Sequence, residues 1–313
     1  MASSRFVSDR GLNVRMGAVM FLLGVLYLGF MAALIVYSGL STVAIIIIAV
    51  GLAFAQWYFS DRIAMLSMRA REVSPEQAPE LHGMVDRLCA LADMPKPRIA
   101  IADTDLPNAF ATGRSPSHSA VCVTTGILDK LTVDEMEGVL AHELSHVAHR
   151  DVMVMTLAAS AGIAAGMLTR GAQYGALFDG RDRRENNGPP FWLIALVVSL
   201  VVYAVSFFLT RLLSRYRELC ADRSGAFLTQ KPAALASALT KISGEIASIP
   251  TRDLRETQGM NAFFIAPAVS GMTLKTLTST HPSLEERLEQ LAKVSAELGR
   301  PMDGGFSAPG LGS

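Results

Sequence analysis

Long apolar stretches alternate with polar ones along this chain, and the first apolar stretch is a pair. Residues 16–60 contain no charged side chain, and a short polar turn at 38–42 divides them into two halves, 16–37 and 43–59. Each half approaches the roughly 20 residues that a helix needs to cross a bilayer. A cleaved signal peptide would have a shorter apolar core and no second apolar run. We therefore predict a transmembrane hairpin over residues 16–60, preceded by a polar segment, residues 1–15.

A second apolar pair lies later in the chain, at residues 152–169 and 191–210, with a charged loop between the two runs. The second of these runs is long and apolar enough to predict a span. We expect the helix that precedes residue 152 to continue into the first run. If both runs crossed, the arginines of the loop would lie outside, against the usual bias. We predict that this pair also spans the membrane, and a shallow or re-entrant pair is the alternative.

Charge and composition place the chain at a membrane. Arginines flank the first hairpin on both sides, and such positive flanks lie on the cytoplasmic face. We therefore expect residues 1–15, and the chain from residue 61 onward, to start in the cytoplasm. Apolar residues make up 50% of the chain, charged residues 18%, and the mean hydropathy is +0.34, which favours a membrane protein over a soluble enzyme. Three scattered cysteines form no disulfide framework, which fits a reducing compartment. The flanking arginines are Arg5, Arg10, Arg15, Arg62, Arg69 and Arg71.

Between the apolar pairs, the pattern predicts a small mixed domain of helices and strands. Apolar residues at helical spacing predict an amphipathic helix over residues 74–94. Short runs at 98–102 and 120–125 are typical of strands. Thr132, followed three residues later by Glu135, predicts the capped start of a further helix. We expect a small sheet packed on that helix.

The second apolar pair divides this domain in the sequence. We place its first part at residues 61–151 and its second part at 211–298, on either side of the hydrophobic hairpin 152–210. The second part contains an Ala-rich helix, a mixed segment without clear period and a last amphipathic helix. A Gly- and Pro-rich tail, residues 299–313, is expected to be disordered. The three elements of the second part lie at residues 231–248, 251–280 and 284–294.

The capped helix carries the chemistry. It contains His142, Glu143 and His146 in an H-E-x-x-H pattern. Residues four apart lie on the same face of a helix, so the two imidazoles can bind one ion. Glu143 lies beside them, where it can act as a general base on a water molecule, as in zinc proteases. We therefore predict one Zn²⁺ per chain, bound by His142 and His146.

A catalytic zinc ion needs a third protein ligand. A metzincin would have a glycine and then a histidine at positions 149 and 152, where this chain has His149 and Val152. His149 lies too far along the helix to share the ion. Glu218 is the candidate, because Asp222 follows one helical turn later. We expect Glu218 to bind the ion and Asp222 to hold the outward N–H of an imidazole, that of His142.

Several motifs together resemble the HtpX-type membrane metalloproteases, which are relatives of the CAAX prenyl proteases. The resemblance implies a fold that combines membrane α-helices with an α+β metalloprotease domain of the zincin type, gluzincin-like, with a small sheet. It implies a zinc endopeptidase of the bacterial inner membrane that acts in quality control and the stress response. The motifs are the N-terminal apolar hairpin, Asn-Ala-Phe-Ala-Thr-Gly at 108–113, His-Glu-Leu-Ser-His at 142–146 with Arg150-Asp151, Glu218 to Asp222, and Thr-His-Pro at 280–282.

The resemblance also implies roles for residues outside the metal ligands. Asn108, Ala109 and Phe110 resemble the edge strand on which thermolysin-like enzymes bind an extended peptide. An ordinary edge strand is the alternative for these three residues. His281 resembles the histidine that donates to the oxyanion during catalysis. As a histidine before a proline at a helix start, it is equally suited to a capping role.

The expected partners follow from the same resemblance. They are the lipid bilayer and unfolded or misassembled membrane proteins, and a homo-oligomer is left open. Lys plus Arg and Asp plus Glu both number 28, so charge gives no argument for nucleic acid. One alternative is a CAAX-type processing enzyme, for which four spans provide too small a membrane chamber. The other is a catalytically silent membrane scaffold, against which the intact Glu143 argues.

Overall fold

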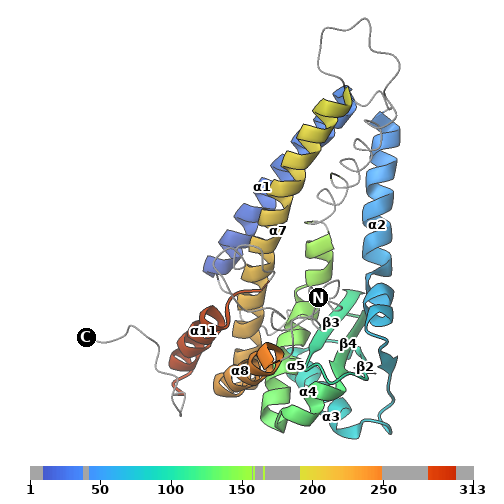
Figure 1. Ribbon diagram of the computed structural model, residues 1–313. Helices are drawn as coiled ribbons and strands as arrows, with labels where there is room; N and C mark the ends of the chain where they lie inside the picture. The colour runs from blue at the N-terminus through green and yellow to red at the C-terminus, as the bar shows by residue number, and fades with distance from the viewer. Residues whose placement is uncertain are drawn as a thin grey trace, which may run out of the picture.

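The computed structural model describes residues 10–37, 42–156, 191–248 and 281–300, together with Ala158 and Ala165. Within them, three long helices rise from a domain of shorter helices and one small sheet (Figure 1). The expected turn at 38–41, most of the run 152–169, the loop that follows it, the segment 251–280 and the tail from residue 301 lie outside the described residues.

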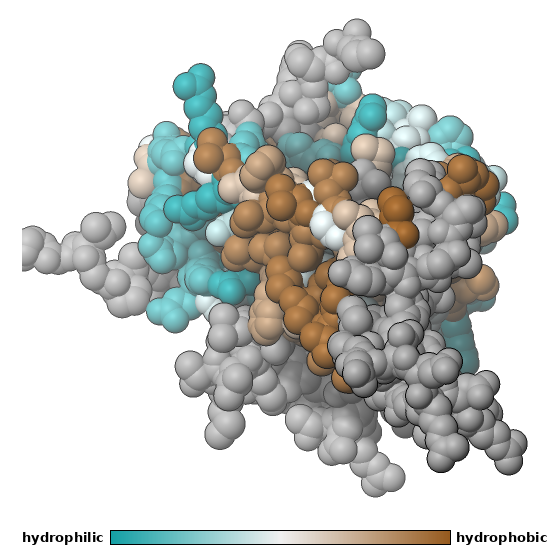
Figure 2. All heavy atoms as spheres, turned by 90° about the horizontal axis from the view of Figure 1, so that it is seen from above, coloured by the Kyte–Doolittle hydropathy of each residue, from teal (hydrophilic) through white to brown (hydrophobic). Residues whose placement is uncertain are grey.

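The long helices are the predicted apolar runs. They are α1 (Arg10–Tyr37), α2 (Thr42–Ser67) and α7 (Phe191–Thr229). The stretches Arg10–Ala33 and Leu196–Thr229 are long and apolar enough to cross a membrane. Large apolar side chains face outward on all three helices, as Phe21 of α1 does with 71% of its surface exposed. When the molecule is seen from above, hydrophobic residues gather in the middle of the view and hydrophilic ones lie toward its margin (Figure 2).

Helix α7 joins the apolar part of the chain to the folded domain without a break. It has 39 residues, which at 1.5 Å per residue is about 58 Å, whereas a hydrocarbon core is about 30 Å thick. Its C-terminal part must therefore extend well beyond any membrane-spanning stretch. The division predicted at residue 210 falls inside this helix. Glu218 and Asp222 lie in the C-terminal part, beside the domain of shorter helices and the sheet.

The small predicted sheet is confirmed, and it has four strands in the order β1-β2-β4-β3. Strands β2 and β4 are parallel, while β1 pairs with β2 and β3 pairs with β4 in antiparallel fashion. β3 is therefore an edge strand. The strands are β1 (Arg71–Glu72), β2 (Arg98–Ala102), β3 (Ala109–Ser115) and β4 (His118–Thr124).

The two faces of the sheet are covered by different helices, since successive side chains of a strand point to opposite sides. Val121 and Val123 of β4 belong to the main core with α5 (Val133–Ala148). Cys122 of β4 and Phe110 of β3 pack against the end of α2. The helix expected to carry the metal ligands thus covers one face of the sheet, and the end of α2 packs on the opposite face.

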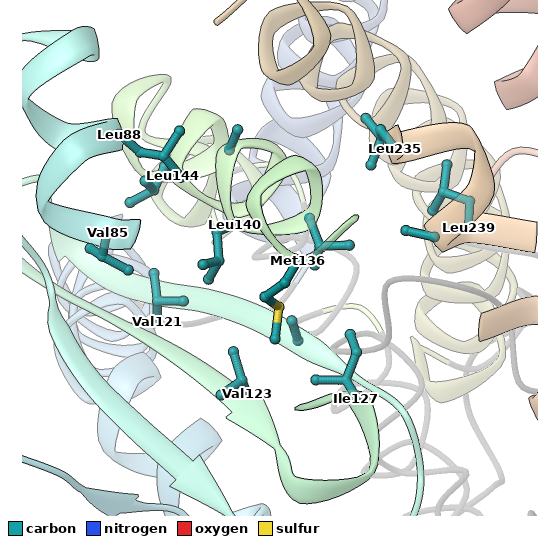
Figure 3. Packing of buried hydrophobic residues seen from close by; sticks show 14 of the residues in the cluster. Val85, Leu88, Val121, Val123, Ile127, Met136, Leu140, Leu144, Leu235 and Leu239 are labelled. Atoms are coloured by element: carbon teal, nitrogen blue, oxygen red, sulfur yellow. The ribbon is translucent and has the colours of Figure 1, made fainter. Parts of the chain in front are cut away.

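Helix α5 is buried on several sides, which fixes its position (Figure 3). Leu140 and Leu144 pack among residues of α3 (Pro79–Ala92), β4 and α4 (Thr125–Lys130). On its other side lies α8 (Pro232–Ser248), with Leu235 and Leu239 in the same cluster. The predicted capping box is present at its start: the Thr132 side chain accepts from the Glu135 N–H, and the Glu135 side chain from the Thr132 N–H.

The expectation that α5 runs on into residues 152–169 is wrong. The helix ends at Ala148, and Arg150 adopts a left-handed conformation with a φ of 56°. Helical backbone resumes at Asp151. A non-glycine residue at positive φ breaks the helical hydrogen-bond ladder and redirects the chain. The turn changes where Asp151 points, and it brings that side chain back toward the end of α5.

Candidate metal centre

Three side chains from two helices meet at one point. The Nε2 atoms of His142 and His146 are 3.2 Å apart, and Glu218 approaches each of them from α7. Its Oε2 lies 3.6 Å from Nε2 of His142, and its Oε1 lies 3.4 Å from Nε2 of His146. One ligand atom from each of the three residues can lie within 4.8 Å of the other two. This is the spacing at which two imidazoles and a carboxylate can bind a single ion.

The donors and the surrounding charges both fit a divalent cation. Oε2 of Glu218 is buried and faces two imidazoles, with Nε2 of His142 at 3.6 Å and Nδ1 of His281 at 3.1 Å, so it is placed to bind a cation. Among the described residues, the buried carboxylates around the triad exceed the buried guanidinium groups by two. A divalent cation would balance this difference, because buried charge is stable only when it is paired. The carboxylates are Glu143, Asp151, Glu218 and Asp222, and the guanidinium groups are Arg217 and Arg287.

Each imidazole faces a carboxylate on the side away from the triad. Asp222 Oδ1 lies 2.9 Å from Nδ1 of His142, and Asp151 Oδ2 lies 2.6 Å from Nδ1 of His146. Such contacts fix the tautomer and orientation of the ring and leave Nε2 for a metal. The sequence predicted the first contact, from the spacing of Glu218 and Asp222. It did not predict the second.

Buried carboxylates also raise the proton affinity of both imidazoles. Burial acts to lower the pKa of His142, but the neighbouring carboxylates of Asp222 and Glu218 outweigh it and raise that pKa above its ordinary value. Burial also acts to lower the pKa of His146, and there the charge of Glu218 and Glu143 raises it. A more basic imidazole is a stronger metal ligand.

Glu143 is placed between the triad and the sheet. Its Oε2 accepts a hydrogen bond from the backbone N–H of Ala111 in β3, at 2.9 Å. The side chain is buried, and this burial raises the pKa of Glu143 above the usual value of a carboxyl group. A carboxylate with a raised pKa next to a metal site is suited to accept a proton and then return it.

Of the predicted peptide-binding residues, Ala109 and Phe110 lie on the edge strand β3 and Asn108 directly precedes it, and their backbone groups face different ways. The backbone of Asn108 is paired with Thr124, since its N–H bonds Thr124 Oγ1 at 2.9 Å and its C=O accepts from the Thr124 N–H at 2.9 Å. Hydrogen-bonded and non-hydrogen-bonded pairs alternate along an antiparallel ladder. Phe110 is therefore directed at β4 as well, whereas Ala109 and Ala111 turn their backbone groups outward.

His281 and Arg287 approach the triad from the C-terminal part of the chain. Nδ1 of His281 lies 3.1 Å from Oε2 of Glu218. Arg287, on α11 (Leu284–Glu297), reaches Asp222 through Nε and one terminal nitrogen, at 2.8 and 2.6 Å. His281 was predicted from the sequence, whereas Arg287 was not. A signal was present, because Arg287 falls on the apolar stripe that Leu284, Leu288 and Leu291 define.

An H-E-x-x-H helix that packs on a small sheet, together with a glutamate from a distant helix, defines a metallopeptidase site. Residues 75–295 match the model of peptidase family M48. The chain belongs to this family. It is 56% identical over 298 residues to "Protease HtpX homolog 1" of Streptomyces coelicolor, covering 95% of this chain and 97% of that protein.

Further relatives carry the same name, and the HtpX-type resemblance is confirmed. The chain is 52% identical over 293 residues to "Protease HtpX homolog" of Moorella thermoacetica, covering 93% of this chain and 97% of that protein. It is 40% identical over 290 residues to the homologue of Pyrococcus furiosus, covering 92% and 98%. The crystal structure of S. mikatae Ste24p has a TM-score of 0.48 and 18% identity, with 88% of this chain and 62% of that chain covered. The relatives and the two apolar helices indicate a metallopeptidase in a membrane.

Proposed function

We propose that this protein is a zinc-dependent endopeptidase with a gluzincin-like site next to the membrane. The observation that carries the proposal is the convergence of His142, His146 and Glu218 beside the buried Glu143. When bound, zinc would supply Lewis-acid chemistry, polarising a carbonyl oxygen and acidifying a water molecule. His142, His146 and Glu218 would hold the ion, and Asp222 would keep His142 in the tautomer that presents Nε2.

Glu143 then acts as the general base and acid. Its carboxylate accepts a proton from the water that attacks the scissile carbonyl, and it later delivers that proton to the leaving amine nitrogen. The N–H of Ala111 binds Oε2 of Glu143 and so orients the carboxylate. His281 would donate a hydrogen bond to the oxyanion of the tetrahedral intermediate, where preorganised donors are most effective. Its position near Glu218 supports this role.

The edge strand would bind the substrate. A peptide that pairs with β3 must be extended, so the site would favour unfolded segments. The outward N–H and C=O of Ala109 and the outward C=O of Ala111 are suited to this pairing, while the N–H of Ala111 bonds Glu143. Asn108 and Phe110 would hold the strand in place through their pairing with β4.

We further propose that the enzyme is a multi-pass protein of the bacterial inner membrane, with its catalytic domain in the cytoplasm. The arginines on both flanks of the first hairpin support this orientation. Its substrates would be damaged or misassembled membrane proteins, in quality control and the stress response. Cysteine-accessibility labelling across residues 170–188 from each side of the membrane tests the topology of the second hairpin.

Casein cleavage by the purified, zinc-loaded protein in detergent tests the activity. We expect cleavage by the native protein, inhibition by a zinc chelator and recovery on adding zinc. Glu143→Gln should lower kcat by about 100-fold to 10,000-fold, the usual contribution of a general base, while zinc binding persists. Equal activity of the variant and the native protein would refute the role of Glu143. Zinc binding without any cleavage would favour the scaffold alternative.

A further inference from the structure

The turn after α5 brings one more carboxylate, that of Asp151, to the metal centre. Arg150, with its positive φ, separates Ala148, the last residue of α5, from Asp151, where helical backbone resumes. Had α5 continued as a regular helix, Asp151 would lie five residues beyond His146 and on another face. The turn instead brings its Oδ2 to 2.6 Å from Nδ1 of His146.

Asp151 is itself held from α7. The guanidinium group of Arg217 forms an ion pair with Oδ1 of Asp151, the oxygen that His146 does not contact. Arg217 also donates to the backbone C=O of His149, at 3.5 Å. The Asp151 and Arg217 side chains are 11% and 9% exposed, so solvent screens this pair little. Arg217 immediately precedes Glu218, so one segment of α7 supplies both a metal donor and the support for another donor.

The arrangement repeats the one around the other histidine. His142 contacts Asp222, which pairs with Arg287, and His146 contacts Asp151, which pairs with Arg217. Each imidazole therefore has a carboxylate and then a guanidinium group behind it. Outer carboxylates of this kind set ring orientation and ligand basicity, and their loss lowers metal affinity.

We propose that Asp151 is the positioning residue for His146, and that Arg217 holds Asp151 in place. The carboxylate of Asp151 accepts the Nδ1–H of His146, which leaves Nε2 for the metal. Asp151 lies just before the apolar run 152–169, and Arg217 lies on α7, which follows that run. Side chains from both sides of the apolar pair therefore converge on one metal ligand. This inference rests on the proposed zinc site.

Zinc affinity of the full-length protein in detergent tests the proposal, by chelator competition with metal analysis. Asp151→Asn should weaken zinc binding by about 10-fold to 100-fold. Arg217→Gln keeps the carboxylate that contacts His146 and removes only its support, so it should weaken zinc binding by clearly less than Asp151→Asn does. Asp86→Asn, which removes an exposed carboxylate paired with Lys96 on the far side of α3, is the matched control and should bind zinc like the native protein.

Thermal unfolding of the metal-free and zinc-loaded forms separates positioning from folding. A positioning role predicts that the zinc-induced rise in Tm becomes smaller in Asp151→Asn than in Arg217→Gln. If Asp151→Asn does not fold, because it leaves a buried guanidinium unpaired, the double variant Asp151→Asn/Arg217→Gln removes the whole pair and is titrated instead. Native zinc affinity in the Asn variant, or equal losses in Asp151→Asn and Arg217→Gln, overturns the proposal. A native protein that binds no zinc overturns the proposed function as well.

Discussion

Arg287 on α11 and Asp222 on α7 form a two-point contact in the interior of the protein. Nε and one terminal nitrogen of Arg287 bind the two oxygens of Asp222 at 2.8 and 2.6 Å, and both side chains are almost fully buried. The same carboxylate lies 2.9 Å from Nδ1 of His142. A second terminal nitrogen of Arg287 lies 3.7 Å from Oε2 of Glu218. Through Arg287, the last described helix, α11, thus contacts both Asp222 and Glu218 of the metal centre.

Arg287→Lys should disrupt the contact with Asp222 although the positive charge is kept. A lysine has a single ammonium group and cannot reproduce the planar, two-point contact with Asp222. Arg287→Met removes the charge altogether and leaves Asp222 buried and unpaired, which costs about 3–5 kcal/mol of the free energy of unfolding. We expect both variants to bind zinc more weakly than the native protein, and the Met variant also to lose thermal stability. Zinc titration and thermal unfolding in detergent measure the two effects.

Arg98→Met is the matched control for that experiment. Arg98 pairs with Glu72 and Asp61 at the protein surface, where its side chain is 48% exposed. Exposed ion pairs contribute about 0–1 kcal/mol, so this variant should bind zinc normally. Unchanged zinc binding in both Arg287 variants would show that α11 does not support the metal centre.

Close packing between α5 and α7 gives a second prediction. Gly225 lies two helical turns after Glu218, and a Cβ atom at this position would come within 2.9 Å of the backbone nitrogen of His142. The atoms that this Cβ would meet belong to the backbone of a packed helix, so they cannot shift without disturbing the packing of α5. Gly225→Ala should force α7 away from α5, lower the free energy of unfolding by about 1–3 kcal/mol and weaken zinc binding.

The control for Gly225 is another helical glycine, Gly244 of α8. A Cβ atom added there meets nothing within 4 Å. Gly244→Ala should raise stability by up to about 1 kcal/mol, because alanine is the better helix former, with native zinc affinity. A Gly225→Ala variant that behaved like Gly244→Ala would mean that the two metal-ligand helices are not packed this closely.

The parts of the site that could be read from the sequence are those with local signals. His142 and His146 lie one turn apart in a helix whose start Thr132 and Glu135 mark by a capping box. The spacing of Glu218 and Asp222 gives the second helix the same kind of signature. In each case the relevant neighbours are within four residues, where helix geometry alone decides which side chains share a face.

The parts that could not be read depend on distant segments. Arg287 contacts Asp222 only because α11 packs on α7 and α8. The apolar stripe of α11 marks Arg287 as a buried residue, but no local pattern names its distant partner. Asp151 reaches His146 because Arg150 takes a positive φ, and an arginine gives no warning of this, since glycine and asparagine are the residues usually found there. The resemblance pointed to Arg150-Asp151 as a motif without indicating what Asp151 contacts.

Acid should remove a stabilising contribution from the start of α5. Glu135 is buried and accepts from the Thr132 N–H, Ser237 and Lys241 at 2.8, 2.6 and 2.8 Å. Burial acts to raise its pKa, but these donors outweigh it and lower the pKa of Glu135 to about 2. A folded-state pKa below the unfolded value of about 4.3 means that the ionised form stabilises the fold. Its contribution is therefore complete above about pH 4.3 and is lost as the pH falls toward 2.

Metal-free native protein and Glu135→Gln, unfolded by heat between pH 7 and pH 3, provide the measurement. The native protein should be the more stable one at pH 7, by at least the roughly 1 kcal/mol that a lost cap costs, and the difference should shrink as the pH falls. Glu245→Gln, which removes an exposed partner of Lys130, should show little difference at any pH. A gap between native protein and Glu135→Gln that stays constant down to pH 3 would contradict the assignment.

A substitution at Ala111 should change the pKa of Glu143 without replacing Glu143 itself. Ala111 faces away from β4, so proline there removes the hydrogen bond to Glu143 while the ladder to β4 is kept. Burial raises the pKa of Glu143, and the Ala111 N–H is one of the groups that oppose this rise. In Ala111→Pro the pKa of Glu143 should therefore rise further. Glu143 must be ionised to act as a base, so the acid limb of kcat/KM should move to higher pH.

The pH profile of casein cleavage by zinc-loaded Ala111→Pro checks this shift, with Ala109→Pro as its matched control. Ala109 also faces outward from β4, two residues earlier on the same strand, so its substitution can weaken peptide binding without changing the environment of Glu143. We expect a displaced acid limb and a lower kcat in Ala111→Pro, and a raised KM with the native acid limb in Ala109→Pro. An acid limb that stays in place in Ala111→Pro would mean that this N–H does not govern the protonation of Glu143. Equal displacement in both variants would point to a general distortion of β3 instead.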